Sequence, residues 1–326
     1  MKHGLPRSGL PDGAHNATIA PVVIRPATDR DRDALWDIFR AVVAGRDTYA
    51  FAPDTPRDVG VGYWFGPDTT SFVAELDGGV VGMYKLIANA TTLGAHVSNA
   101  SFMVDPAAAG HGIGRAMGVH ALGEARAQGY DAMQFNFVVS TNRRAVALWQ
   151  SLGFRTVGTL PKAFRHGSRG LVDAYVMHRF LDDIVPTFGD AGGEATAVVR
   201  PSAYAVIANP RHEIAIVSAD EGTLLPGGGA DADETPDAAV IREVREECAL
   251  RVRIVTNLGD ATQFVHSARH AAHYEKRSHF VAAEVITPAE NAPEHETRWI
   301  PLHDALRAVT YASHAWAIRR WARLNT

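Results

Sequence analysis

A glycine-rich stretch followed by an acidic helix constrains this chain more than any other feature of its sequence. Residues 227–250 read GGGADADETPDAAVIREVREECAL. Thr235, followed by proline, favours a helix start, with a hydroxyl at the N-cap and proline in the first turn. On that helix Glu243, Glu246 and Glu247 follow one another at i, i+3 and i+4, so their carboxylates share one face. The stretch therefore predicts an unobstructed backbone loop beside a strongly acidic helix face.

Clustered carboxylates repel one another unless a cation lies among them. A site made only of oxygen ligands suits Mg²⁺ or Mn²⁺, which retain several waters and bridge to phosphate oxygens. A simpler interpretation is a solvated acidic helix in which Arg242 and Arg245 pair with the glutamates. The full spacing favours the metal, because Glu234 follows Gly228 after five residues and Arg242 follows after seven more.

This spacing resembles the Nudix box, G-x5-E-x7-R-E-U-x-E-E-x-G-U, where U is a bulky aliphatic residue. The chain departs from it at one fixed position, because Ala249 replaces the glycine that ends the helix, usually with positive φ. We therefore expect a changed helix exit. The resemblance implies an α/β/α sandwich, a metal-dependent hydrolase of nucleoside diphosphate derivatives, and a Glu234–Arg242 pair that braces the loop against the helix.

The resemblance also assigns roles to the acidic residues. Glu246 and Glu247 are implied as metal ligands, with the carbonyl of Gly227 as a third. Glu243 is implied as a ligand or as the base that deprotonates the attacking water. The metal would lower the pKa of that water and neutralise the phosphates.

Length and composition set the outer bounds. A chain of 326 residues favours two domains, and a formal net charge of −4 without a long basic run argues against general nucleic-acid binding but not against nucleotides. Cys248 is the single cysteine, which excludes a disulfide within the chain. No apolar run approaches the roughly 18 residues of a membrane span, and residues 1–21 lack the apolar core of a signal peptide. We expect a cytoplasmic protein without a membrane partner; its oligomeric state stays open.

A second chemical signal is a glycine loop between a predicted strand and a predicted helix. The strand over 97–104 stops at Asp105-Pro106, and the glycine loop 110–114 then opens a helix to about Gln128. A strand over 132–139 and a helix that begins at Asn142 follow. Unobstructed N–H groups at a helix N-terminus make an anion site, although a plain tight turn also explains G-x-G.

The order of these elements, with NRRAVALWQSLGF over 142–154, is similar to the GNAT-type N-acetyltransferases across roughly residues 22–181. The resemblance implies a GNAT fold whose mixed sheet splays between strands 97–104 and 132–139 to admit the pantetheine arm of acetyl-CoA. The cofactor contacts that it implies are Met103, Val104, Gly110, His111, Gly112, Ile113, Gly114, Arg115 and Asn142, with the pyrophosphate on the N–H groups of residues 110–115.

Two positions depart from the GNAT pattern. Ala109 stands where the family's loop usually begins with arginine or glutamine, so one side-chain contact to the cofactor is lost. Trp149 stands where the family often has the tyrosine that protonates the departing thiolate, and an indole N–H is no useful acid. Either another group or water must therefore supply that proton.

Three asparagines give a closer resemblance. HVSNASF over 96–102 and FNFVVSTN over 135–142 look like the fungal acetyltransferases that act on azetidine-2-carboxylate and related proline analogues. This implies that Asn99, Asn136 and Asn142 hold the substrate without a protein general base. Asn142 can equally be a helix N-cap. Because the strand 132–139 is so apolar and alternates strictly, we expect Asn136 on a covered face rather than in solvent.

Four histidines, His266, His270, His273 and His279, precede or enter the predicted strand 278–285. A zinc site is disfavoured, since no cysteine lies near them. We expect instead a loop that closes over a nucleotide, with Lys276 and Arg277 on its phosphates. Glu294 or Glu296 would supply the further carboxylate that many Nudix enzymes bring from a late loop, and both stay open.

The predicted organisation is therefore a mobile tail over 1–21, an acetyltransferase domain over 22–182, a linker over 183–196 and a Nudix domain over 197–326. The predicted function joins an acetyl-CoA-dependent N-acetyltransferase for a small amine or imino acid to a Mg²⁺-dependent pyrophosphohydrolase of a nucleoside diphosphate derivative. The alternative makes the Nudix half a nucleotide sensor that binds without cleaving; the intact triplet of Glu243, Glu246 and Glu247 argues against it.

Overall fold

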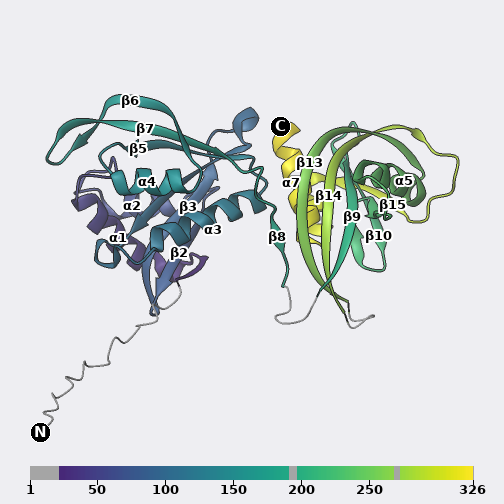
Figure 1. Ribbon diagram of the computed structural model, residues 1–326, viewed down its shortest axis with the longest axis horizontal. Coiled ribbons are helices and arrows are strands. Elements are labelled where there is room, and N and C mark those ends of the chain that lie inside the picture. The colour runs from purple at the N-terminus through teal and green to yellow at the C-terminus, as the bar shows by residue number, and fades with distance from the viewer. Residues whose placement is uncertain (1–21, 191–196, 268–271, 326) are drawn as a thin grey trace, which may run out of the picture.

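The computed structural model describes residues 22–190, 197–267 and 272–325, and it forms two halves that lie side by side (Figure 1). The predicted tail, the second part of the predicted linker and His270 lie outside the described residues. In the described ranges, no helix combines the length and the apolarity that crossing a membrane requires.

The N-terminal half is built on one seven-stranded sheet with the order β1-β2-β3-β4-β5-β7-β6. Its strands are β1 (Val23–Pro26), β2 (Thr70–Leu76), β3 (Gly79–Ala88), β4 (Val97–Val104), β5 (Ala132–Val139), β6 (Arg155–His166) and β7 (Gly170–Phe180). Only β4 and β5 are parallel, and they pair at Val97↔Ala132 and Ser98↔Met133 before they separate. The mixed, splayed sheet expected from the sequence is therefore confirmed.

Two pairs of helices cover the two faces of this sheet. The helices α1 (Arg32–Ala44) and α2 (Arg57–Trp64) pack on one face, where Leu35 and Trp64 meet Met103 in one core cluster. The helices α3 (Ile113–Ala127) and α4 (Arg143–Ser151) pack on the other, where Met117 and Trp149 share a second cluster. The point where β4 and β5 separate therefore lies between two helix layers.

The C-terminal half contains a five-stranded sheet, β12-β9-β14-β13-β8, and a three-stranded sheet, β11-β10-β15. The strands are β8 (Thr187–Phe188), β9 (Val198–Ile207), β10 (Glu213–Ala219), β11 (Gly222–Leu224), β12 (Gly227–Gly229), β13 (Leu250–Ser267), β14 (Ala272–Pro288) and β15 (Thr297–Pro301). The helix α5 (Pro236–Cys248) packs on one face of the larger sheet, and α7 (Ala312–Asn325) packs on the other. This is the α/β/α sandwich that the sequence predicts.

Two expectations for the C-terminal half change. β8 lies in the predicted linker but pairs with β13, so this part of the linker belongs to a sheet. The predicted nucleotide-covering loop is wrong, because Lys276 lies in β14, where it is buried and ion-paired with Glu221. The chain ends in two helices, α6 (Leu302–Ala308) and α7, which extended backbone at Val309 separates.

The helix α7 also joins the two halves, because it docks against the C-terminal end of α3 (Figure 1). The Trp316 indole N–H donates to the backbone oxygen of Arg126 at 2.7 Å, and the Arg126 guanidinium lies 5.3 Å from the Trp316 ring centroid. Arg320 pairs with Asp131 at 2.7 Å. Both Trp316 and Arg126 are buried, so the halves share a desolvated contact.

Candidate functional sites

The glycines before α5 let the backbone approach the acidic helix closely. Gly227 has a φ of 136°, and a Cβ there would lie 2.2 Å from the backbone oxygen of Ala203. A Cβ on Gly228 would lie 2.7 Å from the carboxylate carbon of Glu243. A side chain is therefore excluded at Gly227, and one at Gly228 would displace the Glu243 carboxylate. The loop thus presents its backbone directly to the glutamates.

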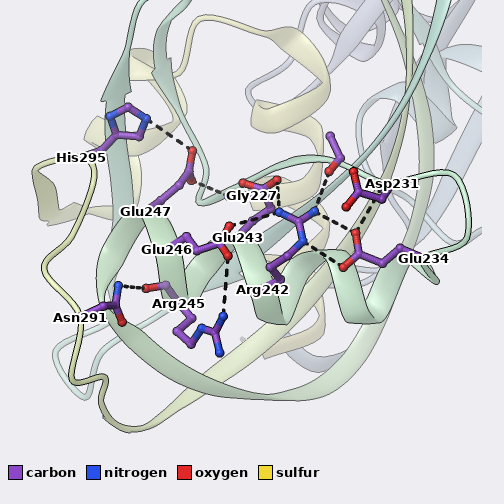
Figure 2. A network of polar contacts seen from close by, with 11 residues as sticks. Gly227, Asp231, Glu234, Arg242, Glu243, Arg245, Glu246, Glu247, Asn291 and His295 are labelled. Atoms are coloured by element: carbon purple, nitrogen blue, oxygen red, sulfur yellow. Dashed lines mark hydrogen bonds and ion pairs between the residues drawn. The ribbon is translucent and has the colours of Figure 1, made fainter.

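Arg242 holds the loop and the helix together, as expected (Figure 2). Its guanidinium donates to both carboxylate oxygens of Glu234, at 3.0 and 2.8 Å, which confirms the predicted brace. It also donates to Glu243 at 2.7 Å and to Glu246 at 3.3 Å. One cation therefore offsets the charge of three neighbouring carboxylates.

Glu247 is the buried member of the triplet. Its carboxylate accepts a hydrogen bond from the Gly227 N–H at 2.9 Å, and the Nε2 of His295 lies 3.7 Å from it. Burial raises the pKa of Glu247 to about 7, and the negative charge of Glu294 adds to that rise. The Glu247 carboxylate is thus poorly neutralised by the protein.

A late loop covers the end of α5 and brings new groups to this site (Figure 2). Carbonyls in the last turn of a helix have no partner within it. Here the Asn291 amide donates to the backbone oxygen of Arg245 at 2.7 Å. The backbone N–H groups of Glu294 and His295 donate to the backbone oxygens of Glu246 and Glu247, each at 3.1 Å. The backbone of Glu294 is therefore held at the end of α5, and the charge of its carboxylate acts on Glu247.

The exit from α5 corrects one expectation. Ala249 has φ 52° and ψ 41°, the left-handed conformation that glycine favours at this position. The helix thus ends as a glycine would end it, and the predicted change in its exit is wrong. The backbone accepts the strain, and the carbonyl of Ala249 accepts a hydrogen bond from the Ala289 N–H at 2.7 Å.

The donor set at this helix fits a hard divalent cation. In the described part of the chain, no three His, Cys, Asp or Glu side chains surround a metal-sized space as they stand, because Glu243 and Glu246 turn toward Arg242. The available donors are carboxylate and carbonyl oxygens, which Mg²⁺ and Mn²⁺ prefer. A cation beside the buried Glu247 would also stabilise its charged form.

In the N-terminal half, an asparagine network spans the point where β4 and β5 separate. The amides of Asn99 and Asn136 donate to the same oxygen, Oδ1 of Asn89, at 3.2 and 2.7 Å. The amide of Gln134 donates to Asn136 at 2.7 Å. The structure therefore brings two of the three predicted asparagines together, and it adds Asn89, which no local sequence signal indicated.

The environment of Asn136 differs from the expectation. Asn136 is exposed rather than covered, because the pairing of β5 with β7 shifts register between Phe135 and Val138. The strict alternation is lost there, so Val138 is buried while Phe137 is 38% exposed. The bulge turns Asn136 toward open space beside the gap.

Asn142 caps α4, as the simpler interpretation predicted, and accepts a hydrogen bond from the Ala145 N–H at 3.2 Å. It also lines a cavity of about 690 Å³ between the end of α1, the start of α4 and the β6–β7 turn. The lining residues are Asp47, Thr48, Thr141, Asn142, Arg143, Arg144, His166, Ser168 and Arg169. Three arginines against one aspartate make this cavity basic.

The glycine loop has the backbone that its sequence predicts. Gly110 and Gly112 have positive φ, at 97° and 75°, and α3 begins directly after them at Ile113. Gly114 permits close packing, since a Cβ there would lie 3.3 Å from Leu148 of α4. The Met103 side chain is buried, so this residue can contact a ligand only through its backbone.

The remaining cofactor candidates surround this loop. Val104 is half-buried at the end of β4, and Arg115 donates to the Ser151 hydroxyl at 3.0 Å. The exposed His111 lies with its Nδ1 3.1 Å from the oxygen of Ala108. Trp149 is buried, 4.7 Å from Phe102 and 4.8 Å from Phe135 between ring centroids, so it belongs to the core.

A partly buried polar cluster on the α1–α2 face escaped the sequence analysis. The Tyr49 hydroxyl donates to the oxygen of Phe102 at 2.7 Å and accepts from the Phe102 N–H at 2.9 Å. The hydroxyls of Tyr63 and Ser101 lie 2.6 Å apart, and Lys85 donates to the backbone oxygen of Tyr63 at 2.7 Å. Tyrosines in an aromatic-rich segment carry no signal of their own that distinguishes such a cluster from core packing.

Comparison with known proteins assigns both halves. Residues 33–154 match the family model of the Acetyltransferase (GNAT) family, and residues 198–322 match that of the NUDIX domain. An N-acetyltransferase of Schizosaccharomyces pombe is 31% identical over 111 residues, which are 34% of this chain and 53% of that protein. The chain thus spans about half the length of this curated relative.

Solved structures match the N-terminal half. A GCN5-related N-acetyltransferase from Kribbella flavida is 43% identical, with 49% of this chain and 97% of that chain covered, at a TM-score of 0.47. A GNAT superfamily phosphinothricin acetyltransferase from Sinorhizobium meliloti, solved in complex with acetyl-CoA, is 24% identical, with 53% and 97% covered, at a TM-score of 0.44.

Proposed function

Since this chain joins a GNAT N-acetyltransferase domain to a Nudix hydrolase domain, we propose that it carries out two reactions. The N-terminal domain, which we place at residues 22–182, transfers an acetyl group from acetyl-CoA to a small amine or imino acid. The C-terminal domain, placed at residues 197–326, hydrolyses a nucleoside diphosphate derivative with Mg²⁺ or Mn²⁺.

The asparagine network carries the proposal for acetyl transfer. Amide groups of Asn99 and Asn136 converge on Asn89 at the opening between β4 and β5, where a ligand can exchange with them for hydrogen bonds. Asn142 lines a basic cavity together with Arg143 and Arg144. Such surroundings favour an acceptor that carries a carboxylate beside its amine.

Acetyl-CoA would be held by the backbone of the glycine loop. The N–H groups of Gly110 to Arg115 precede and open α3, where partial positive charge favours the pyrophosphate. The backbones of Met103 and Val104 would line the pantetheine arm at the end of β4. When bound, acetyl-CoA supplies the activated acyl group, and the protein's contribution is to position the amine against it.

Replacing Asn136 tests this arrangement. Removing one such hydrogen-bonding group typically lowers turnover by about 10²- to 10³-fold, so we expect Asn136→Ala to lower kcat by that factor while acetyl-CoA affinity changes little. Trp149→Phe should have a much smaller effect, because Trp149 packs in the core. Initial rates with small amino and imino acids give the result, and an unaffected Asn136→Ala enzyme would exclude the proposed positioning.

For the C-terminal domain, the supporting observation is the buried and poorly neutralised Glu247 beside Gly227. Glu246, Glu247 and the Gly227 carbonyl would hold the metal, and Glu243 would ligate it or deprotonate the water. The metal, when bound, lowers the pKa of water and offsets phosphate charge. Arg242 would release Glu243 and Glu246 to the metal while it keeps its two bonds to Glu234.

A matched pair of variants tests hydrolysis. Glu246→Gln should remove most phosphate release from nucleoside diphosphate derivatives, because it removes a charged metal ligand. Glu284→Gln is the control, since Glu284 is exposed and pairs with Arg253 on β13. Wild-type rates in excess chelator would contradict the metal assignment. Binding of these compounds without any turnover would instead support the alternative, a nucleotide-sensing module.

A further inference from the structure

The Tyr49 hydroxyl lies at an unpaired strand edge. In an antiparallel ladder, the N–H and C=O of one residue point to the same side. Both groups of Phe102 bond to Tyr49, at 2.9 and 2.7 Å, so both point away from β3. Because β4 and β5 stop pairing at Ser98, four residues earlier, this edge of β4 faces the gap between them.

The chemistry of Tyr49 suits a hydrogen-bond donor. Burial raises the pKa of its hydroxyl above the ordinary range, so it keeps its proton at neutral pH. Its position is fixed from the protein side, because its ring stacks 6.4 Å from that of Phe51 and the neighbouring Ser101 bonds to Tyr63. A hydroxyl can turn about its C–O bond and redirect this proton without moving the ring.

We propose that Tyr49 is a catalytic residue of acetyl transfer, and this rests on the proposed acetyltransferase function. With acetyl-CoA between β4 and β5, the Tyr49 O–H would turn from the Phe102 carbonyl and donate to the thioester oxygen. The Phe102 N–H, which donates to the Tyr49 oxygen, would be shared with the thioester oxygen. Two donors held in place by the fold stabilise the negative charge that develops on this oxygen. This assigns a side chain of the α1–α2 connection to the reaction centre, opposite the Trp149 position.

The electron and proton balance is simple. The neutral amine nitrogen attacks the carbonyl carbon, and the C=O electron pair moves to the oxygen held by Tyr49 and Phe102. Collapse of this intermediate re-forms the C=O bond and breaks the C–S bond. The nitrogen loses one proton to solvent and the CoA thiolate gains one from solvent. Tyr49 keeps its own proton throughout.

The matched variants are Tyr49→Phe and Tyr63→Phe, each of which removes one hydroxyl from the same cluster. Only Tyr49 contacts the Phe102 backbone, whereas Tyr63 bonds to Ser101. We expect Tyr49→Phe to lower kcat about 10²- to 10³-fold, as loss of one donor to a developing oxyanion does. Tyr63→Phe should lower it only a few-fold, and CoA should bind both variants like the wild type.

The carbonyl stretch of bound acetyl-CoA, labelled with ¹³C at the acetyl carbonyl, gives a second readout. Wild-type protein should shift this infrared band below its frequency in solution, Tyr49→Phe should reverse part of that shift, and Tyr63→Phe should retain it. An unshifted band in the wild type overturns the proposal even if Tyr49→Phe does not fold. Tighter acetyl-CoA binding by Tyr49→Phe with unchanged kcat also overturns it, since Tyr49 would then only fill the empty gap.

These outcomes separate the two levels of the argument. Absence of acetyl-CoA binding by the wild type overturns both the acetyltransferase function and the role of Tyr49. Acetyl transfer that proceeds equally well in Tyr49→Phe leaves the function standing and removes Tyr49 from the reaction.

Discussion

At the scale of single residues, Lys85 is a buried amine without a carboxylate partner in the part of the chain that the structure describes. Its Nζ donates to the oxygen of Tyr63 and lies 3.3 Å from the Tyr63 ring centroid. Neither contact offsets the loss of water, so burial lowers the pKa of Lys85 to about 8. The folded protein therefore carries a charge that it stabilises poorly at neutral pH.

This makes stability depend on pH in a defined direction. Between about pH 8 and 10 the unfolded chain holds the Lys85 proton and the folded chain has lost it, so the free energy of unfolding rises with pH. Lys85→Met should remove this rise. At pH 7 the variant should gain up to roughly 3 kcal/mol of stability, because it has no poorly stabilised charge. The lost hydrogen bond to Tyr63 should reduce this gain by about 1 kcal/mol. The free energy of unfolding of both proteins, measured with urea at pH 7, 8, 9 and 10, tests this prediction. An equal rise with pH in the wild type and in Lys85→Met would contradict it.

At the scale of elements, α5 ends in a strained residue that holds a functional loop. A left-handed conformation costs a residue with a Cβ roughly 1–2 kcal/mol, whereas glycine adopts it freely. Ala249 bears this strain at φ 52°, while its carbonyl anchors Ala289 at the start of the loop that carries Glu294. The helix thus ends in the left-handed conformation that glycine usually adopts there, although the residue is alanine.

Ala249→Gly should therefore raise the free energy of unfolding by about 0.5–1 kcal/mol, after the greater freedom of glycine in the unfolded chain is subtracted. Ala238→Gly in the first turn of the same helix is the control and should lower it by about 1 kcal/mol, because there the backbone is right-handed. Thermal and urea unfolding give both values. If both substitutions changed the free energy of unfolding in the same direction, Ala249 would not be strained.

Elements with a strong local signal could be predicted from the sequence. The start of α5 follows from Thr235 and Pro236, and β4 and β5 have the bounds that their apolar runs indicated. The helix α2 was missed because its sequence, RDVGVGYW, contains two glycines that disfavour a helix. It is stabilised by Trp64, which is fully buried among residues distant in the sequence.

The residues of the candidate sites also fall into those that the sequence predicts and those that it does not. Glu234, Arg242 and the acidic triplet are fixed by spacing along one helix and its preceding loop, so the sequence located them together. Asn89, Tyr49 and His295 reach their sites through strand pairing and loop docking between distant segments. The sequence around each of these three residues does not indicate these contacts, so the residues could be assigned to the sites only from the folded structure.

At the scale of the whole molecule, Asp131 forms ion pairs where the two halves dock. It pairs with Arg320 of α7 at 2.7 Å and with the buried Arg126 at 3.4 Å. Removal of one partner from a buried ion pair leaves the other charge uncompensated, which is costly. Asp131 thus compensates two arginines at the surface where α3 and α7 meet.

Asp131→Asn should weaken this docking and separate the unfolding of the two halves. We expect a lower and broader calorimetric transition, with a loss of roughly 1–3 kcal/mol, because part of the pair remains accessible to water. Asp183→Asn is the control, since Asp183 pairs with Arg179 within the N-terminal half and is exposed. A calorimetric trace for Asp131→Asn that superimposes on the wild type would show that this charge does not hold the halves together.

The docking of α7 on α3 has a consequence for how this protein tolerates dissection. Two surfaces carried on one polypeptide meet at an effective concentration that is typically millimolar, far above that of free proteins in a cell. A contact of one tryptophan and a few arginines can therefore hold the halves together here, yet be too weak to reunite them once the peptide between them is cut. The uncut polypeptide, rather than the affinity of α7 for α3, then keeps the two candidate active sites in one molecule.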